Sequence, residues 1–310
     1  MNVHVRLAAA GLIIAALGTA ACSPAPEDKA AQTAAAPAAS PDVHAFKVGA
    51  LDVMALRDGG MSGVPNDNTV LGVGRTPAEV AAVLTANNLP GDSFSLSVQP
   101  LLVRDGARLV LLDAGAGASF GAGAGKLPAS LAAAGVQPGQ ITDVLISHSH
   151  GDHVIGLVNA AGGLTFPNAT IRMAAAEWEF LKANAEMRAL VDAITPKVQT
   201  FQPGAAALTP SISSVAINGH TPGHMGYEIR SGAERLLYIG DTMHHSVISV
   251  QRPEWAIAFD TDGPTATASR EALLERAATE NLRIHAVHFP YPGLGRIQRR
   301  DDGFVWVAER

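Results

Sequence analysis

The chain has 310 residues, 47% of them hydrophobic and 16% charged, and its formal net charge is −6 at pH 7. A chain of this length can bury a full core, and one domain of about 260 residues behind a leader fits it better than two independent domains. Because the charge is mildly negative and Lys and Arg form no long run, we expect no nucleic-acid partner, which would need a basic surface.

The first 21 residues are typical of a secretory signal peptide. His4 and Arg6 precede an apolar run over residues 7–17, and small residues lead from there to Cys22. The run is short for a membrane span. Cys22 stands where a lipoprotein signal is cut and lipidated, but the usual Leu three residues before it is missing, so simple cleavage is the alternative. We therefore expect a periplasmic or secreted protein, either free or anchored to the membrane through a lipid on Cys22.

Residues 22–44 are rich in Ala and Pro, which predicts a flexible tether. The folded domain is expected over residues 45–310. Cys22 is the only cysteine of the chain, so the domain forms no internal disulfide and offers no thiolate to a metal.

Strand and helix signals follow in order along the first part of the domain. Alternating apolar residues predict a strand over Phe46–Leu56. A helix should begin at Thr76, because Thr76 and Glu79 form a capping-box pattern and a proline takes the first helical position. Two more strands, over Ser95–Val103 and Ala107–Leu112, are predicted on either side of an Arg-Asp-Gly turn.

Residues 115–125 form a glycine-rich loop with one aromatic residue, Phe120. A phosphate-binding loop would end in Gly-Lys-Ser/Thr before a helix, and the sequence after residue 125 does not supply that ending. We expect instead a mobile flap beside the site, where Phe120 contacts substrate; a surface aromatic without a role is the alternative. A short helix over Pro128–Ala134 should follow.

The next stretch carries the chemistry. Ile141–Ile146 is apolar and short enough for a buried strand, and three imidazoles and a carboxylate follow it within six positions, at His148, His150, Asp152 and His153. With the backbone extended, alternate side chains point the same way, so His148 and His150 can reach one ion. Asp152 and His153 would lie on the turn into the next helix and face a second ion. This donor set suits zinc, and also manganese, iron or cobalt.

The remaining elements are predicted from periodicity. A helix over residues 154–158 should present its N-terminus to the metals, and Trp178 lies on a longer helix expected over 174–191, where it either packs or faces substrate. The other predicted elements are strands over 171–173, 215–217, 227–229, 236–239 and 284–287, and a helix over 265–280.

The pattern His-x-His-x-Asp-His after a buried strand resembles the signature of the metallo-β-lactamase superfamily. The resemblance implies an α/β fold, a four-layer αββα sandwich, with a two-metal site at one edge. Its later ligands would be His224, which follows a Thr-Pro-Gly turn, Asp241 after a strand, and His288. The same turn carries His220, which would then support the site or serve the structure.

The resemblance also implies how these residues divide the work. His148, His150 and His224 would hold one ion, Asp152, His153 and His288 the other, and Asp241 would bridge them. Two residues would act from outside the ligand set. Asp113 would hold a ligand His by its free ring nitrogen, unless it is only a turn residue. His244 takes the place of a substrate-contacting Tyr of the family's lactonases, and the role of His245 is open.

The expected activity is hydrolysis by a hydroxide that bridges two divalent ions, most simply zinc, with Asp152 and Asp241 as the catalytic carboxylates. The C-terminal third is most similar to exported methyl parathion hydrolases, which implies a small phosphotriester, aryl ester or lactone as substrate. The alternatives are a quorum-quenching lactonase or a glyoxalase-type thioesterase on the same site, and a metal-stabilised envelope lipoprotein that binds a ligand without catalysis. A homodimer is left open.

Overall fold

The computed structural model describes residues 40–204 and 207–309, without the side chains of residues 118–120. The expected signal peptide, Cys22 and most of the expected tether lie outside this described part. The first strand begins at Val43, two residues before the expected start of the domain. Within the described residues, no helix has the length and apolar composition needed to cross a membrane.

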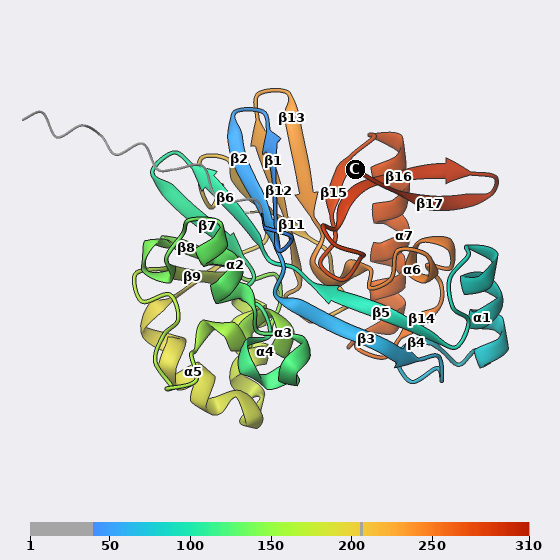
Figure 1. The fold of residues 1–310 in the computed structure, drawn as a ribbon, viewed down its shortest axis with the longest axis horizontal. Coiled ribbons are helices and arrows are strands. Elements are labelled where there is room, and N and C mark those ends of the chain that lie inside the picture. Colours follow the sequence, from blue (N-terminus) through green and yellow to red (C-terminus); the bar gives the residue numbers. More distant parts are fainter. Residues whose placement is uncertain (1–39, 205–206, 310) are drawn as a thin grey trace, which may run out of the picture. The chain divides into compact units, whose positions relative to one another are not determined.

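Two sheets carry most of the strands (Figure 1). The first sheet has seven strands in the order β1-β2-β6-β7-β8-β9-β10. Their bounds are Val43–Val48, Leu51–Leu56, Leu101–Asp105, Arg108–Leu112, Asp143–Leu145, Thr170–Ala174 and Val198–Phe201. The second sheet has six strands in the order β11-β12-β13-β15-β16-β17. Their bounds are Ile212–Ala216, Met225–Ser231, Glu234–Tyr238, Arg283–His285, Leu294–Arg300 and Gly303–Ala308.

The two sheets pack face to face around a shared apolar core. That core takes side chains from the first sheet, such as Val53, Leu101 and Val110, and from the second, such as Tyr227 and Ile229. All five are at most 1% exposed. Strand side chains alternate between the two faces of a sheet, so the outer face of each sheet also carries apolar side chains that other elements must bury.

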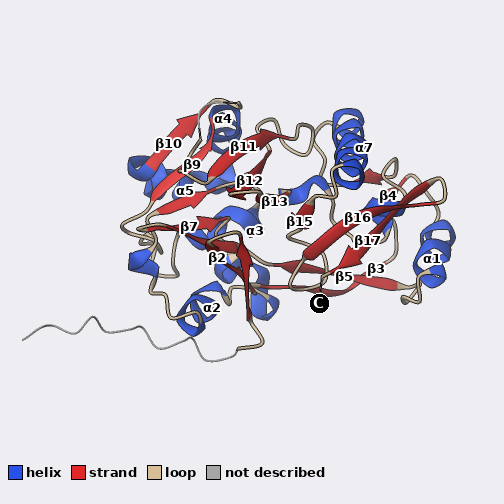
Figure 2. Ribbon diagram, turned by 90° about the horizontal axis from the view of Figure 1, so that it is seen from above, coloured by secondary structure: helices blue, strands red, loops and turns tan. Residues whose placement is uncertain are grey.

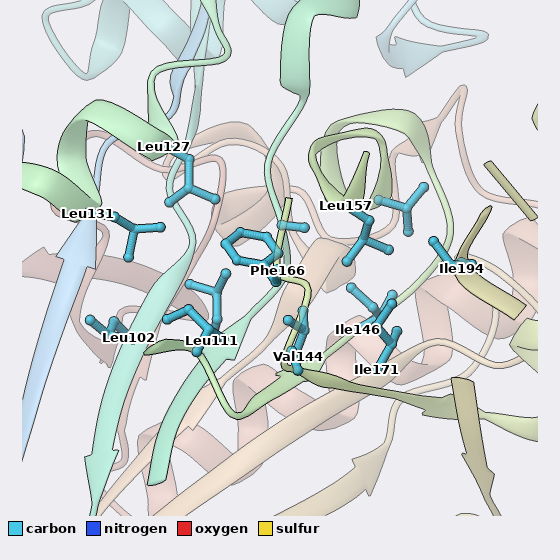
Figure 3. Packing of buried hydrophobic residues seen from close by; sticks show 14 of the residues in the cluster. Leu102, Leu111, Leu127, Leu131, Val144, Ile146, Leu157, Phe166, Ile171 and Ile194 are labelled. Carbon is cyan, nitrogen blue, oxygen red and sulfur yellow. The ribbon is translucent and has the colours of Figure 1, made fainter. Parts of the chain in front are cut away.

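Helices cover both outer faces (Figure 2). On the first sheet, α2 (Leu127–Ala133), α4 (Ala175–Ala183) and α5 (Arg188–Ile194) bury residues of one outer cluster, part of which Figure 3 shows. On the second sheet, α7 (Gly263–Thr279) and α6 (Ile248–Gln251) bury the other. The order of layers is helix, sheet, sheet, helix, which is the αββα architecture that the sequence resemblance implies.

A smaller unit extends the fold beside the second sheet. It pairs β3 (Gly59–Pro65) with β5 (Ser93–Val98), and β4 (Leu71–Val73) with β14 (Ala256–Ile257). Helix α1 (Pro77–Ala86) packs there through Val80 and Leu84. Thr76 and Glu79 form the predicted capping box at its N-terminus.

Three predicted elements away from the metal groups are divided or end early in the structure. The strand over Phe46–Leu56 is the hairpin β1-β2, which turns at Gly49. The strand over Ser95–Val103 is divided into β5 and β6 at Gln99, whose buried side chain donates to the backbone of the second sheet's loops. The long helix expected over 174–191 ends at Ala183, because the side chain of Asn184 accepts from a backbone N–H and starts a new turn.

Candidate metal centre

Loops from both sheets meet at one edge of the sandwich. Strands β7 and β8 run parallel in the first sheet, and β13 and β15 run parallel in the second. The carboxyl ends of parallel strands lie at the same edge of a sheet. Asp113 follows β7, residues 147–153 follow β8, Asp241 follows β13 and His288 follows β15. The loop between β11 and β12 completes the set with His220.

One group consists of His148, His150, His220 and Asp241. The Nε2 atom of His220 lies 3.2 Å from Nε2 of His148 and 3.0 Å from Nδ1 of His150. The Oδ2 atom of Asp241 lies 3.6 Å from Nε2 of His148 and 3.5 Å from Nε2 of His220. Three imidazole nitrogens and one carboxylate oxygen thus converge on a common point.

The second group consists of Asp152, His153 and His288. Oδ2 of Asp152 lies 3.6 Å from Nε2 of His153 and 3.5 Å from Nε2 of His288. Asp241 reaches this group too, with Oδ1 at 3.2 Å from His153 Nε2 and Oδ2 at 3.0 Å from His288 Nε2. Asp241 therefore lies between the two groups, as a bridging carboxylate must.

The donor atoms fit metal ions in spacing and in chemistry. Ligands placed tetrahedrally at ~2.0–2.1 Å from zinc are about 3.3 Å apart, and the donor–donor distances given above range from 3.0 to 3.6 Å. Nε2 of His153 and Oδ1 of Asp241 are buried and have no hydrogen-bond partner in the described structure. Buried polar atoms without a partner are rare and costly, and two divalent ions would satisfy them.

In three histidines, a contact at Nδ1 shows that Nε2 is free to bind an ion. Nδ1 of His220 lies 2.9 Å from Oδ1 of Asp260, and Nδ1 of His153 lies 2.7 Å from Oδ2 of Asp113. Nδ1 of His288 lies 2.6 Å from the carbonyl oxygen of Ser97. Such contacts hold the proton on Nδ1 and leave the Nε2 lone pair for an ion.

His224 does not have that freedom, and the interpretation of His224 as a ligand needs correction. Its Nδ1 donates to the carbonyl oxygen of Ile217 at 2.9 Å, and its Nε2 accepts from the backbone N–H of Asp241 at 2.9 Å. Both ring nitrogens are engaged within the protein, and His224 belongs to neither group. The structure puts His220 in the place expected of His224. His224 instead orients the backbone that presents Asp241.

Charge is strongly coupled across the site. Burial lowers the pKa of His148 well below its ordinary value, and the neighbouring His153 adds to that shift. Burial alone would also lower the pKa of His153, but the carboxylates of Asp241, Asp152 and Asp113 together raise it well above the ordinary value. The imidazoles around Asp241 in turn hold its pKa well below the usual range, against the effect of burial. An ionised carboxylate at the centre of the cluster is what a cation site requires.

Asp113 has the supporting contacts that the resemblance implies. It is 1% exposed and accepts from the Ser147 N–H at 2.7 Å, the Ser147 hydroxyl at 2.7 Å and the Tyr238 hydroxyl at 2.6 Å, besides its contact with His153. Its φ of 61° lies in the left-handed region, where a non-glycine residue is uncommon and tolerated mainly for Asn and Asp. One carboxylate thus fixes the ring of His153 and the start of the loop that carries His148.

The helix after the motif begins earlier than predicted. Helix α3 runs over Gly151–Val154, so Asp152 and His153 lie within its single turn rather than before it, and the segment from Ile155 to Leu157 is a 3-10 helix. The helical turn aims both side chains at the second group. No helix of useful length points its N-terminus at the site from residues 154–158.

A cavity of about 250 Å³ opens onto both groups. Besides ligands of the two groups, it is lined by Met61, Leu96, His244 and Phe259. The imidazole of His244 is 1% exposed, stacks on His288 with ring centroids 5.1 Å apart, and has no hydrogen-bond partner in the described structure at either ring nitrogen. His244 therefore stands in the cavity wall next to Asp241, 3.2 Å from its Oδ2.

The two predicted substrate residues have different outcomes. Trp178 lies away from this cavity, and the position of the Phe120 side chain is not described. Trp178 is 9% exposed and packs in the outer core of the first sheet, where Lys182 lies over its ring. It does not line the cavity at the metal groups, so a substrate-facing role is not supported. Phe120 lies in the 3-10 helix Gly117–Gly123, and its side chain is outside the described part.

Five contributors to the site are not predicted from the sequence: Met61, Leu96, Phe259, Asp260 and Glu177. Met61 and Leu96 come from the β3-β5 unit, whose place beside the cavity only the tertiary fold shows. Asp260 contacts Nδ1 of His220, and Glu177 accepts from the backbone N–H of Ser149, and both contacts join segments that are distant in the chain. The one local signal for Asp260 is an acidic residue in a turn close before a helix, which is too common to have singled it out.

Comparisons with known proteins agree with this geometry. A family profile described as the Metallo-beta-lactamase superfamily matches residues 96–288. No curated protein matches the chain. Among solved structures, AidC, described as a dizinc quorum-quenching lactonase in complex with a product, is 30% identical with a TM-score of 0.81 and covers 86% of this chain and 97% of its own.

Two further structures extend the comparison. A hydrolase described as AbOPH in the beta lactamase superfamily is 28% identical, with a TM-score of 0.78, over 88% of this chain and 99% of its own. A probable metal-dependent hydrolase from Staphylococcus aureus is 20% identical, with a TM-score of 0.70, over 86% of this chain and 100% of its own. The likeness to the latter bears on the fold alone.

Proposed function

Since the chain belongs to the metallo-beta-lactamase superfamily and is a metal-dependent hydrolase of that class, we propose that it opens neutral lactones that carry an apolar acyl chain. Two divalent ions, most simply zinc, would be held by His148, His150 and His220 and by Asp152, His153 and His288, with Asp241 between them. The observation that carries this proposal is the cavity of about 250 Å³ that joins these ligands to the apolar side chains of Met61, Leu96 and Phe259.

The lining of the cavity argues for an uncharged substrate. Among the described residues that line it, none is a Lys or Arg. A charged group of the substrate that lies away from the two ions, such as the carboxylate of a β-lactam, would need such a partner to offset the loss of its hydration on burial. A neutral lactone ring needs none, and its acyl chain gains about 25 cal/mol for each Å² of apolar surface that it buries. The most similar solved structures reported above include a quorum-quenching lactonase, which favours a lactone further.

When bound, a pair of divalent ions supplies an activated water and polarises the attacked carbonyl. The chain's own residues do the rest. Asp241 fixes the relative position of the two groups through its two oxygens. Asp152, whose carboxylate faces the cavity, is placed to accept and release a proton. Nδ1 of His244 has no hydrogen-bond partner in the described structure, and we assign to it a hydrogen bond to an oxygen of the substrate.

A phosphotriester or aryl ester is the second candidate substrate. The same neutral lining accommodates a triester, and Phe259, which is 41% exposed at the cavity, offers a face for stacking on an aryl leaving group. The sequence similarity to methyl parathion hydrolases motivates this candidate and makes it the direct competitor of the lactone.

One assay panel separates the candidates. The purified, zinc-loaded protein would be offered an N-acyl-homoserine lactone, an aryl ester, a dialkyl aryl phosphate and a glutathione thioester under the same conditions. We expect kcat/KM for the lactone to exceed the others by at least about tenfold, which is 1.4 kcal/mol of transition-state binding. A faster phosphotriester or thioester reaction would replace the lactone as substrate, and no hydrolysis of any of them would overturn the proposal.

We also propose that the protein is exported, from the signal-like character of residues 1–21. The expected result is a processed protein in the periplasmic or membrane fraction. If a Cys22→Ser variant is processed to the same size and stays in the membrane fraction to the same extent, a lipid at Cys22 is not what holds the protein there.

A further inference from the structure

Glu177 is a buried carboxylate outside the ligand set that touches both loops of the first metal group. It lies in the first turn of α4 and has no exposed surface. Its Oε1 accepts from the backbone N–H of Ser149 at 2.7 Å and from the Ser149 hydroxyl at 2.5 Å. Its Oε2 accepts from the Thr221 hydroxyl at 2.7 Å and from the backbone N–H of Gly223 at 3.0 Å. Four donors therefore surround one carboxylate.

The positions of these donors relate Glu177 to the histidines. Ser149 stands between His148 and His150, and Thr221 directly follows His220. The two segments are about seventy residues apart in the chain, as the contact of His150 with His220 shows. Glu177 is thus a link, besides any ion, between the loop that carries two of these imidazoles and the loop that carries the third.

The backbone is built around this link. A Cβ atom added to Gly223 would lie 2.3 Å from the backbone nitrogen of Glu177, closer than any real side-chain contact. Glycine at this position lets the loop of His220 sit directly on the start of α4. The carboxylate of Glu177 therefore has little freedom to move away from its partners, and neither loop can shift without breaking charge-assisted hydrogen bonds.

The second metal group is held by other contacts. His153 is fixed by Asp113 and His288 by the carbonyl of Ser97. Glu177 makes no hydrogen bond to either side chain in the described structure, and its partners Ser149 and Thr221 belong to the first group's loops. Glu177 therefore supports only the segments around His148, His150 and His220, whereas Asp113 reaches both groups through Ser147 and His153.

On this geometry we propose that Glu177 is a positioning residue for the ion held by His148, His150 and His220, and that it sets the affinity of that ion independently of the other. The inference rests on the proposed metal centre. Supporting side chains around metal ligands are worth about 10–100-fold in metal affinity. Loss of Glu177 should lower the affinity of one metal-binding step and leave the affinity of the other unchanged.

The test is a two-step titration of the metal-free full-length protein with Co²⁺, followed by absorption spectroscopy and calorimetry. Glu177→Gln keeps the shape of the side chain but turns one acceptor oxygen into an NH2 group that faces a donor. We expect one Co²⁺ affinity to fall about 10–100-fold while the other changes less than about threefold. The matched control is Glu228→Gln, a buried glutamate paired with Arg276 on the second sheet, which should leave both affinities unchanged.

A second variant covers the case in which Glu177→Gln does not fold. Thr221→Val removes one donor to Oε2 and retains volume. It should weaken the same step by about threefold or more, a smaller loss than that of Glu177→Gln, because Glu177 keeps its other three donors. Unchanged affinities in the folded variants, or an equal loss at both steps, would overturn the role of Glu177. A wild-type protein that binds no Co²⁺ would instead overturn the proposed metal centre.

Discussion

Replacing Asp113 by Asn should weaken both the fold and the metal site. Asp113 accepts four hydrogen bonds, three at Oδ2 and one at Oδ1. If the amide oxygen takes the Oδ2 position, the NH2 group faces the N–H of Ser147, so one bond is lost and two donors oppose each other. A bond to a charged group is worth about 1.5–3 kcal/mol and an unsatisfied buried donor costs about 1–3 kcal/mol. We expect the metal-free protein to lose about 2.5–6 kcal/mol of unfolding free energy.

The metal effect is measured separately from the fold. Competition between the protein and a chromophoric chelator should show a loss of about 10–100-fold in zinc affinity for Asp113→Asn, because Nδ1 of His153 then donates to a neutral amide oxygen instead of a carboxylate. Asp143→Asn is the control: Asp143 is equally buried at the other end of β8 and pairs with Arg108 and Arg172. It should reduce stability in urea but leave zinc affinity within about threefold. Equal zinc affinities in the two variants and the wild type would refute the reasoning.

Three more predictions follow from other parts of the structure. Removing the ions with a chelator should lower the unfolding free energy by about 2.7 kcal/mol for each ion whose free concentration had been a hundred times its Kd, and added zinc should restore it in a thermal melt. Asp58 is buried and accepts from the N–H groups of Ala116 and Leu127 at both ends of the glycine-rich loop, so Asp58→Asn should cost about 1–3 kcal/mol and speed proteolysis within the loop; an unchanged cleavage rate would contradict this. Burial, with a smaller effect of His44, lowers the pKa of His285 to about 3 from 6.5. Between pH 3 and 6.5 the unfolded state therefore binds a proton at His285 that the folded state does not bind, so the unfolding free energy falls as pH drops from 6.5 toward 3. At pH 5, His285→Phe should remove about 2 kcal/mol of that loss. Parallel curves of unfolding free energy against pH for the variant and the wild type would contradict this prediction.

Much of the fold follows from local signals in the sequence. The capping box of Thr76 and Glu79 fixes the start of α1, and the apolar run before residue 147 predicts the strand that presents the first ligands. Two boundaries could not be predicted because the deciding contact is remote or weak. Gln99 divides one predicted strand by donating to the backbone of residues 286 and 289. Asn184 ends a predicted helix because its side chain accepts from the backbone N–H of Glu186. Many surface Asn side chains make no such hydrogen bond, so the sequence does not predict this one.

The site shows a similar limit. Periodic spacing brings His148, His150, Asp152 and His153 together, but it cannot choose between His220 and His224, which flank the same turn. The choice depends on whether a ring nitrogen meets Asp260 or the backbone of Asp241, and these partners lie 17 to 40 residues away. The same applies to Glu177. A glutamate in the first turn of a helix is usually exposed, and only the approach of two distant loops shows that this one is buried.

The most direct test of the two-ion centre is anomalous diffraction at the zinc edge from crystals of the zinc-loaded protein. The structure predicts two peaks about 3.5–4 Å apart, one within ~2.0–2.1 Å of Nε2 of His220 and one at the same distance from Nε2 of His153, with Asp241 between them. A single peak, or a peak coordinated by His224 in place of His220, would contradict the account.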